Sequence, residues 1–193
     1  MFPELLRSRL ADVAELPVEQ VAALQAHYEL MVRWNRTINL TAIRSVEEAV
    51  ERHYCESVFL AVHLPAGRLR IADIGSGAGF PGFPVAVLRP DCSVTLVESH
   101  RRKSVFLQEA ARGLGNLKVR AMRAEEVRES FDFVISRAVS YEDLTPVVQR
   151  LASRMALLTG AEEAPEKMGF RWEAPISLPW GSHRYLRIGS CFA

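Results

Sequence analysis

The sequence predicts a doubly wound α/β fold with a mostly parallel sheet, and three features of the chain point to it. A short apolar segment, 69–74, leads directly into a glycine-rich loop, as a buried parallel strand does before a turn. Apolar strands and amphipathic helices then alternate, which favours right-handed crossovers in one sheet. The last two strands, 170–174 and 184–190, are joined by a short loop and should be antiparallel.

Helices should dominate the first third of the chain. Two are predicted within residues 3–36, the second beginning at Pro17, because apolar residues recur there at helical spacing. A third helix should begin after Thr41 or Ser45, and Ser45 forms a capping-box pattern with Glu48. It should end before Pro65 and Gly67. We therefore expect an N-terminal helical extension at 1–65 and an α/β core at 66–193.

The core elements are assigned from apolar runs and turn residues. In chain order, strands are predicted at 69–74, 93–98, 117–122, 131–136 and 155–159, before the closing pair. Helices are predicted after Pro84, within 99–115 and at 144–152, with a short turn or helix at 123–125. In the second of these helices the residues expected to face inward are Val105, Phe106, Leu107 and Ala110.

Composition narrows the class of protein. The chain has 193 residues, a net charge of +1 and no apolar run long enough to span a membrane. Its three cysteines are isolated and lack metal-ligand spacing. No secretory signal is visible at the N-terminus. We expect a cytoplasmic monomer without a metal site or a membrane partner.

The glycine loop indicates a bound cofactor. Gly75, Gly77 and Gly79 follow Asp73 in the pattern G-x-G-x-G, and Phe80 stands where the dinucleotide fingerprint has its third glycine. Glu98 ends the next strand, where a carboxylate can accept hydrogen bonds from ribose hydroxyls. On their own these features also admit a nicotinamide dehydrogenase, or a tight turn without a ligand.

Six segments occur in order along the chain: WNRTINLT, ERHYCES, DIGSGAGFPG, VES with RRKSVFL, RAEE and ISRA. In this respect the sequence resembles the glucose-inhibited division protein B family of ribosomal RNA small subunit methyltransferases. The resemblance implies a class I S-adenosylmethionine-dependent methyltransferase fold (Rossmann-like) with an N-terminal helical extension. It also implies methyl transfer from S-adenosylmethionine to N7 of a guanine in the decoding-region hairpin of 16S ribosomal RNA, in the small ribosomal subunit.

The resemblance carries a set of cofactor contacts onto this sequence. Glu98 matches the acid at the ribose, Ala124 and Glu125 match the pair at the adenine, and Arg137 in ISRA matches an arginine at the end of the pocket. The full set of expected cofactor-binding residues is Asp73, Gly75, Gly77, Gly79, Phe80, Glu98, Ala124, Glu125 and Arg137. No catalytic nucleophile or base is expected, because guanine N7 has a lone pair and no proton; Arg137 would support in-line transfer.

Basic and polar residues near the cofactor are expected to contact RNA. They are Arg33, Asn35, Arg36, Asn39, Arg52, His53, Arg101, Arg102 and Lys103. A structural role is favoured for His53 over a substrate contact, and Trp34 is expected to bury its ring rather than to stack on a base.

The sequence departs from the family pattern after the fifth strand. Thr159-Gly160 stands where the family has Lys-Gly, and the following segment, with Pro165, should form a turn rather than a helix. This leaves two alternatives open: a cofactor-binding family member with weakened or lost catalysis that acts as an RNA-binding or regulatory protein, and a small-molecule methyltransferase.

Overall fold

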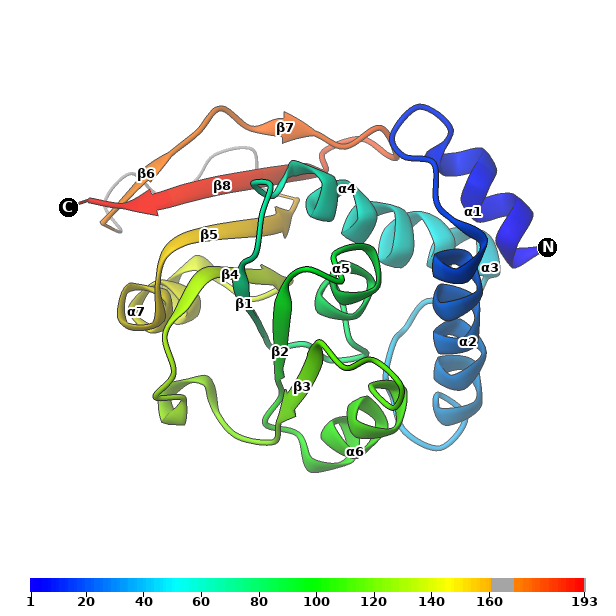
Figure 1. Ribbon diagram of the computed structural model, residues 1–193, viewed down its shortest axis with the longest axis horizontal. Helices are drawn as coiled ribbons and strands as arrows, with labels where there is room; N and C mark the ends of the chain where they lie inside the picture. Colours follow the sequence, from blue (N-terminus) through cyan, green and yellow to red (C-terminus); the bar gives the residue numbers. More distant parts are fainter. Residues whose placement is uncertain (161–168, 193) are drawn as a thin grey trace.

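The strands form one twisted sheet at the centre of the molecule (Figure 1). The structure is a computed structural model that describes residues 1–160 and 169–192. Within them the strands are β1 Arg70–Ile74, β2 Ser93–Val97, β3 Leu117–Arg120, β4 Phe131–Arg137, β5 Ala152–Thr159, β6 Phe170–Trp172, β7 Ile176–Ser177 and β8 Tyr185–Cys191. The order is β3-β2-β1-β4-β5-β8-β6, with β7 paired to β8.

The predicted fold class is confirmed. Strands β1 to β5 are parallel to one another, and β8 runs antiparallel to β5, β6 and β7. The short strand β7 lies within the loop predicted to join the last two strands and was not expected. The turn predicted from Pro165 lies outside the described residues.

Helices cover both faces of the sheet, and the N-terminal helices form an outer layer. The helical elements are α1 Phe2–Leu10, α2 Val18–Trp34, α3 Val46–Ala49, the π-helix η1 Val50–Cys55, α4 Glu56–His63, α5 Gly82–Leu88, α6 Arg101–Ala110, the 3₁₀ helix η2 Ala124–Glu126 and α7 Tyr141–Leu151. Figure 1 shows α4, α5 and α6 on one side of the sheet and α7 on the other. None of the described helices is long and apolar enough to cross a membrane.

The helices of residues 1–65 share one hydrophobic cluster with the sheet. Leu24 of α2 and Tyr54 of η1 belong to the same buried cluster as Phe80, Leu96 and Phe133. Burial of this apolar surface fixes the N-terminal helices against α5 and α6. The division of the chain at residue 65 stays a prediction, because the packing crosses it.

The third predicted helix is confirmed in its extent but not in its regularity. Ser45 Oγ accepts a hydrogen bond from the Glu48 N–H at 3.1 Å, as expected for the N-cap of the helix. The helix then widens into η1, where the Glu56 N–H donates to the Glu51 carbonyl, five residues earlier. Wide turns of this kind inside α-helices frequently mark functional sites.

One expectation for α6 is wrong. Phe106 and Leu107 are fully buried as predicted, but Val105 is 47% exposed and Ser104 is buried instead. The reason is helical phase: Ser104 and Leu107 are three residues apart and share the buried face, so Val105 turns toward solvent.

Candidate functional site

The glycine loop joins β1 to α5 and needs its glycines for backbone reasons. Gly75, Gly77 and Gly79 have φ values of +71°, +57° and +91°, a region that side chains disfavour. The Gly75 and Ser76 N–H groups donate to the Val97 carbonyl at 3.0 and 3.2 Å. These two bonds fix the loop over the carboxyl end of β2.

Glu98 follows β2 and faces this loop. Its Oε2 accepts from the Gly77 N–H at 2.8 Å, and its Oε1 accepts from the His100 N–H at 2.7 Å. The side chain is 8% exposed. Each carboxylate oxygen keeps a further lone pair, so the group can still accept from two hydroxyls of a ligand.

A pocket of ≈ 190 Å³ lies between the loop and the ends of β2 and β4. Four of the predicted cofactor residues line it: Gly75, Glu98, Ala124 and Glu125. They meet because ligands of open parallel sheets bind at the carboxyl ends of the strands. We call this space the loop pocket.

The other predicted residues of the loop support it from behind. Asp73 is fully buried, and its Oδ2 accepts from the Gly82 N–H at 2.9 Å. Burial raises the pKa of this carboxyl to about 7. Phe80 is also buried and stacks on His53, with ring centroids 4.5 Å apart. Neither residue lines the loop pocket.

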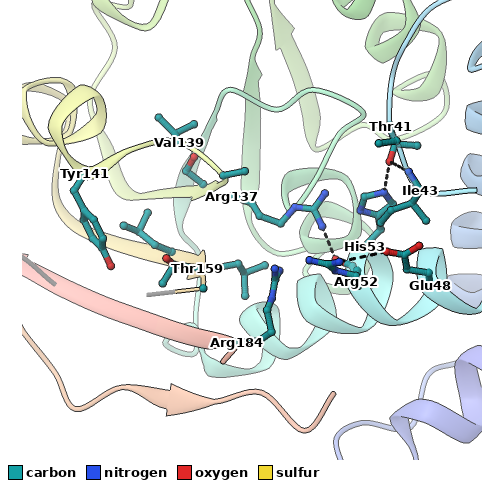
Figure 2. Close-up of a pocket in the computed structure, with 16 residues that line it drawn as sticks. Thr41, Ile43, Glu48, Arg52, His53, Arg137, Val139, Tyr141, Thr159 and Arg184 are labelled. Carbon is teal, nitrogen blue, oxygen red and sulfur yellow. Dashed lines mark hydrogen bonds and ion pairs between the residues drawn. The ribbon is translucent and has the colours of Figure 1, made fainter. Parts of the chain in front are cut away.

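A second pocket of ≈ 440 Å³ adjoins the first, and Val139 lines both. Figure 2 shows guanidinium groups from three different parts of the chain that converge on it: Arg52, Arg137 and Arg184. Thr159 lines the same space. We call it the arginine pocket. No group of three or more His, Cys, Asp or Glu residues in 1–160 and 169–192 is arranged to hold a metal ion.

Arg137 lies in the arginine pocket and not in the loop pocket, where the sequence analysis places it with the cofactor contacts. Its Nη1 donates to the main-chain carbonyl of Arg52. The guanidinium carbon also lies 5.5 Å from the centroid of the Phe80 ring, within range of a cation–π interaction. Burial lowers the pKa of Arg137 to about 10, so the side chain stays charged at neutral pH.

Arg184 was not predicted from the sequence. Its Nη2 lies 2.6 Å from Oε2 of Glu56, which is 1% exposed. Burial raises the pKa of Glu56, and the charge of Arg184 opposes this effect. The two residues are 128 positions apart, so no local pattern could have identified the pair.

His53 is buried against the core and also lines the arginine pocket, so the structural role that the sequence analysis favours over a substrate contact stays a prediction. Its Nε2 lies 2.9 Å from Thr41 Oγ1, which also accepts from the Ile43 N–H. Burial, with the nearby charge of Arg137, lowers the pKa of His53 to about 2. The ring is therefore neutral at physiological pH and brings no positive charge to a phosphate.

The side-chain amide of Asn35 forms hydrogen bonds to the main chain of the loop that follows α2. Its Oδ1 accepts from the N–H groups of Leu40 and Thr41 at 2.8 and 3.1 Å, and its Nδ2 donates to the Thr41 carbonyl at 3.0 Å. These bonds hold the loop that carries Thr41 to the arginine pocket. The predicted RNA contact of Asn35 stays a prediction.

The remaining predicted RNA contacts lie mainly on two neighbouring helices. Trp34 of α2 is half-buried with its ring against Phe106 of α6, centroids 5.9 Å apart. Around this contact most of the basic side chains are exposed: Arg33, Arg36, Arg101 and Arg102, with Lys103 half-buried. Asn39 is exposed as well.

Solved methyltransferases share this architecture. A fibrillarin pre-rRNA processing protein from Methanococcus jannaschii has a TM-score of 0.58 and 14% identity, covering 72% of this chain and 75% of that one. A SAM-dependent methyltransferase from Aquifex aeolicus has a TM-score of 0.56 and 15% identity, and the match covers 75% of this chain and 92% of that one. The SAM-bound magnesium protoporphyrin IX methyltransferase of Synechocystis has a TM-score of 0.57 and 17% identity, and the match covers 91% of this chain and 97% of that one. At these identities the likeness shows the class I methyltransferase fold.

Relatives identify the family. A ribosomal RNA small subunit methyltransferase G from Halorhodospira halophila is 44% identical over 139 residues, covering 70% of this chain and 66% of the relative. One from Xylella fastidiosa is 45% identical over 136 residues, covering 69% and 59%. The chain thus spans less than two thirds of the length of these relatives. A family model matches residues 20–166, and the chain belongs to that family, GidB, the rRNA small subunit methyltransferase G family.

Proposed function

We propose that this protein transfers a methyl group from S-adenosylmethionine to N7 of a guanine in the decoding-region hairpin of 16S ribosomal RNA. The observation that carries the proposal is the pair of adjoining pockets that share Val139. One is built from a glycine loop and Glu98, and the other from converging arginines. This arrangement suits a nucleoside cofactor beside an anionic substrate.

The residues of the loop pocket fit S-adenosylmethionine. A Cβ atom on Gly75 would lie 3.0 Å from Val139 Cγ2, so glycine keeps the backbone open at the boundary of the two pockets. Glu98 would accept from the ribose hydroxyls, and Glu125 would accept from the adenine amine. When bound, the cofactor supplies an electrophilic methyl group on a positively charged sulfur.

Guanine N7 carries an in-plane lone pair and no proton, so the protein has to position the base rather than remove a proton. Alignment of reacting groups can supply up to ~7–11 kcal/mol of the barrier. With its pKa lowered to about 2, His53 is too weak a base to take up a proton at neutral pH, which agrees with a mechanism that needs no general base. The arginine pocket would hold phosphate groups next to the base, since cationic side chains position nucleic acid without reading its sequence.

The proposal is tested by transfer of labelled methyl groups. The purified protein is incubated with S-adenosylmethionine and either 30S subunits or naked 16S RNA that lacks the modification. We expect label at one guanine, located by chain cleavage at N7-methylguanine. Calorimetry should show binding of S-adenosylmethionine and none of NAD. Tight NAD binding without S-adenosylmethionine binding would point to a dehydrogenase instead, and label only on small molecules would reject the RNA substrate.

A second candidate rests on Thr159, which lines the arginine pocket where the family resemblance expects a lysine. On this alternative the protein binds the cofactor and RNA but transfers weakly. Thr159→Lys separates the two: a large gain in transfer favours weakened catalysis in the natural sequence, whereas an unchanged or lower rate favours the enzyme as it stands. Thr159→Arg provides a matched cationic control.

The cellular setting follows from this proposal. A methyltransferase of the small ribosomal subunit would act in the cytoplasm, where its substrate is assembled. We also propose that it acts as a monomer, which sedimentation of the purified protein would test; a stable dimer would contradict it.

A further inference from the structure

His27 lies on α2, outside both pockets, yet it touches the segment that ends the glycine loop. Its ring is 2% exposed. It stacks on Phe83, with ring centroids 4.0 Å apart and an interplanar angle of 23°. It also meets the edge of Phe80, with centroids 5.3 Å apart at 87°. An imidazole of the N-terminal helices thus packs against the far side of the loop.

The contact with the loop backbone is close. A Cβ atom on Gly79 would lie 3.3 Å from His27 Nε2 and 3.2 Å from Phe83 Cβ, at a φ of +91°. A side chain at this position would need the imidazole to shift by a few tenths of an ångström and would also be strained by the positive φ. The position of the ring therefore limits the path that the backbone can take between Ala78 and Phe80.

Tyr54 of η1 orients this ring. Its hydroxyl lies 2.8 Å from His27 Nδ1, and Tyr54 is fully buried. Burial lowers the pKa of His27 to about 3 and raises the pKa of Tyr54, so both groups are neutral. A phenol is a stronger acid than a neutral imidazole N–H, so we assign the donor to Tyr54. The imidazole proton then resides on Nε2.

Nε2 is the ring atom that faces the loop. It makes no hydrogen bond of ordinary geometry, but an interaction with the main chain of Ala78 partly opposes the effect of burial on the pKa of His27. The loop is otherwise held by its own bonds: the Gly79 and Phe80 N–H groups donate to the Ser76 carbonyl at 2.7 and 3.0 Å. The imidazole supports this turn from outside.

We propose that His27, oriented by the Tyr54 hydroxyl, is a positioning residue for the cofactor loop. The Nε2 edge of the ring holds Ala78, Gly79 and Phe80 in the path that aims the earlier loop residues at the loop pocket. The N-terminal helices thereby become part of the cofactor site without touching the cofactor. This inference rests on the proposed function, because the ligand of the loop is taken to be S-adenosylmethionine.

Two conservative variants test the role. Tyr54→Phe removes only the hydroxyl, and His27→Phe keeps a flat ring but removes both nitrogens. Each should weaken S-adenosylmethionine binding about three- to tenfold, the range expected for one lost hydrogen bond, with RNA affinity unchanged. The double variant should be no worse than the worse single one, because both act on the same contact. Amide hydrogen exchange of Phe80 and Phe83 in the free protein should become faster.

A matched control separates positioning from general stability. Leu10→Ala on α1 removes a fully buried side chain that lines neither of the two pockets. It should lower the melting temperature while leaving cofactor affinity and loop exchange unchanged. The inference is overturned if both Tyr54→Phe and His27→Phe bind the cofactor as tightly as the unaltered protein. It is also overturned if Leu10→Ala weakens binding as much at an equal loss of stability. If the unaltered protein binds no S-adenosylmethionine, the proposed function fails. The amide exchange rates of Phe80 and Phe83 in the variants still show whether His27 holds the loop in place.

Discussion

The guanidinium of Arg137, at the end of β4, donates a hydrogen bond to the main-chain carbonyl of Arg52 in η1. The two residues are 85 positions apart, and the bond ties the central sheet to the N-terminal helices at the arginine pocket. Because the acceptor is an uncharged carbonyl, the bond orients Arg137 without neutralising its charge. An anion in the pocket can therefore still pair with it.

Arg137→Ala is expected to remove most methyl transfer while the protein still folds. If Arg137 meets the cofactor carboxylate, as the family resemblance implies, the variant binds S-adenosylmethionine more weakly and the salt dependence of RNA binding does not change. If it meets an RNA phosphate, cofactor binding stays intact and the salt slope falls by about one. Arg137→Lys keeps the charge and serves as the control. Full transfer by Arg137→Ala would leave this residue with a structural role alone.

Glu98→Ala should weaken binding of S-adenosylmethionine by roughly 1–3 kcal/mol, because the ribose hydroxyls lose a charged acceptor. The same change frees the Gly77 and His100 N–H groups that Glu98 now accepts from. Glu98→Gln retains one acceptor oxygen and should lose less. Isothermal titration calorimetry measures both variants. An unchanged dissociation constant for Glu98→Ala would mean that this carboxylate does not contact the ligand.

Gly82→Ala should destabilise the fold by about 1–3 kcal/mol, the usual range for overpacking. Its new Cβ would lie 2.7 Å from Asp73 Oδ2 and would also clash with Leu96. Gly115→Ala is the matched control, because no atom lies within 4 Å of a Cβ placed there. Urea unfolding compares the two. Equal stability of both variants would show that β1 and α5 separate more easily than their packing indicates.

Acid should destabilise the protein through two buried histidines. Burial lowers the pKa of His27 to about 3 and that of His53 to about 2. Below pH 6.5 these two histidines therefore become protonated in the unfolded chain but stay neutral in the folded chain. Asp73 acts in the opposite direction between its ordinary pKa of 3.8 and its raised value of about 7, because there the folded chain holds the extra proton. Glu56, whose pKa burial also raises, opposes the histidines in the same way as Asp73. Stability should therefore fall as the pH is lowered from about 6 to 4.5, by roughly 1 kcal/mol per pH unit at most.

Single substitutions separate these contributions. Asp73→Asn removes one opposing group and should make stability fall more steeply with acid, whereas His27→Phe removes one histidine and should make the fall shallower. Urea unfolding at several pH values gives the slopes. If Asp73→Asn leaves the slope unchanged, this carboxyl is ionised in the folded protein across the window.

Much of the loop pocket could be predicted because its determinants are local. Gly75 and Ala124 come shortly after predicted strands and Glu98 ends one, and the carboxyl ends of parallel strands meet at one edge of the sheet. The arginine pocket could be predicted only in part. Arg52 and Arg137 belong to recognisable segments, but Arg184 reaches the site from a loop before β8.

Other features depend on packing that no local pattern encodes. The contact of His27 with Tyr54 joins two helices whose relative position is set by the shared core. The π-helix η1 lies inside a segment that the sequence analysis predicts as one regular helix, so its wider turn was not predicted. Val105 shows the same limit on a smaller scale, since an error of one position moves a side chain from the core to solvent.

The π-helix has a consequence for the evolution of this segment. Each residue advances an α-helix by about 100°, so the extra residue held in η1 sets α4 out of phase with α3. A one-residue deletion there would give a regular helix that is easier to form, but the residues before it would rotate against those after it. Arg52 and His53 would then leave the pocket while Glu56 kept its place beside Arg184. The irregular turn thus makes the length of this segment, and not only its composition, a condition for assembling the site.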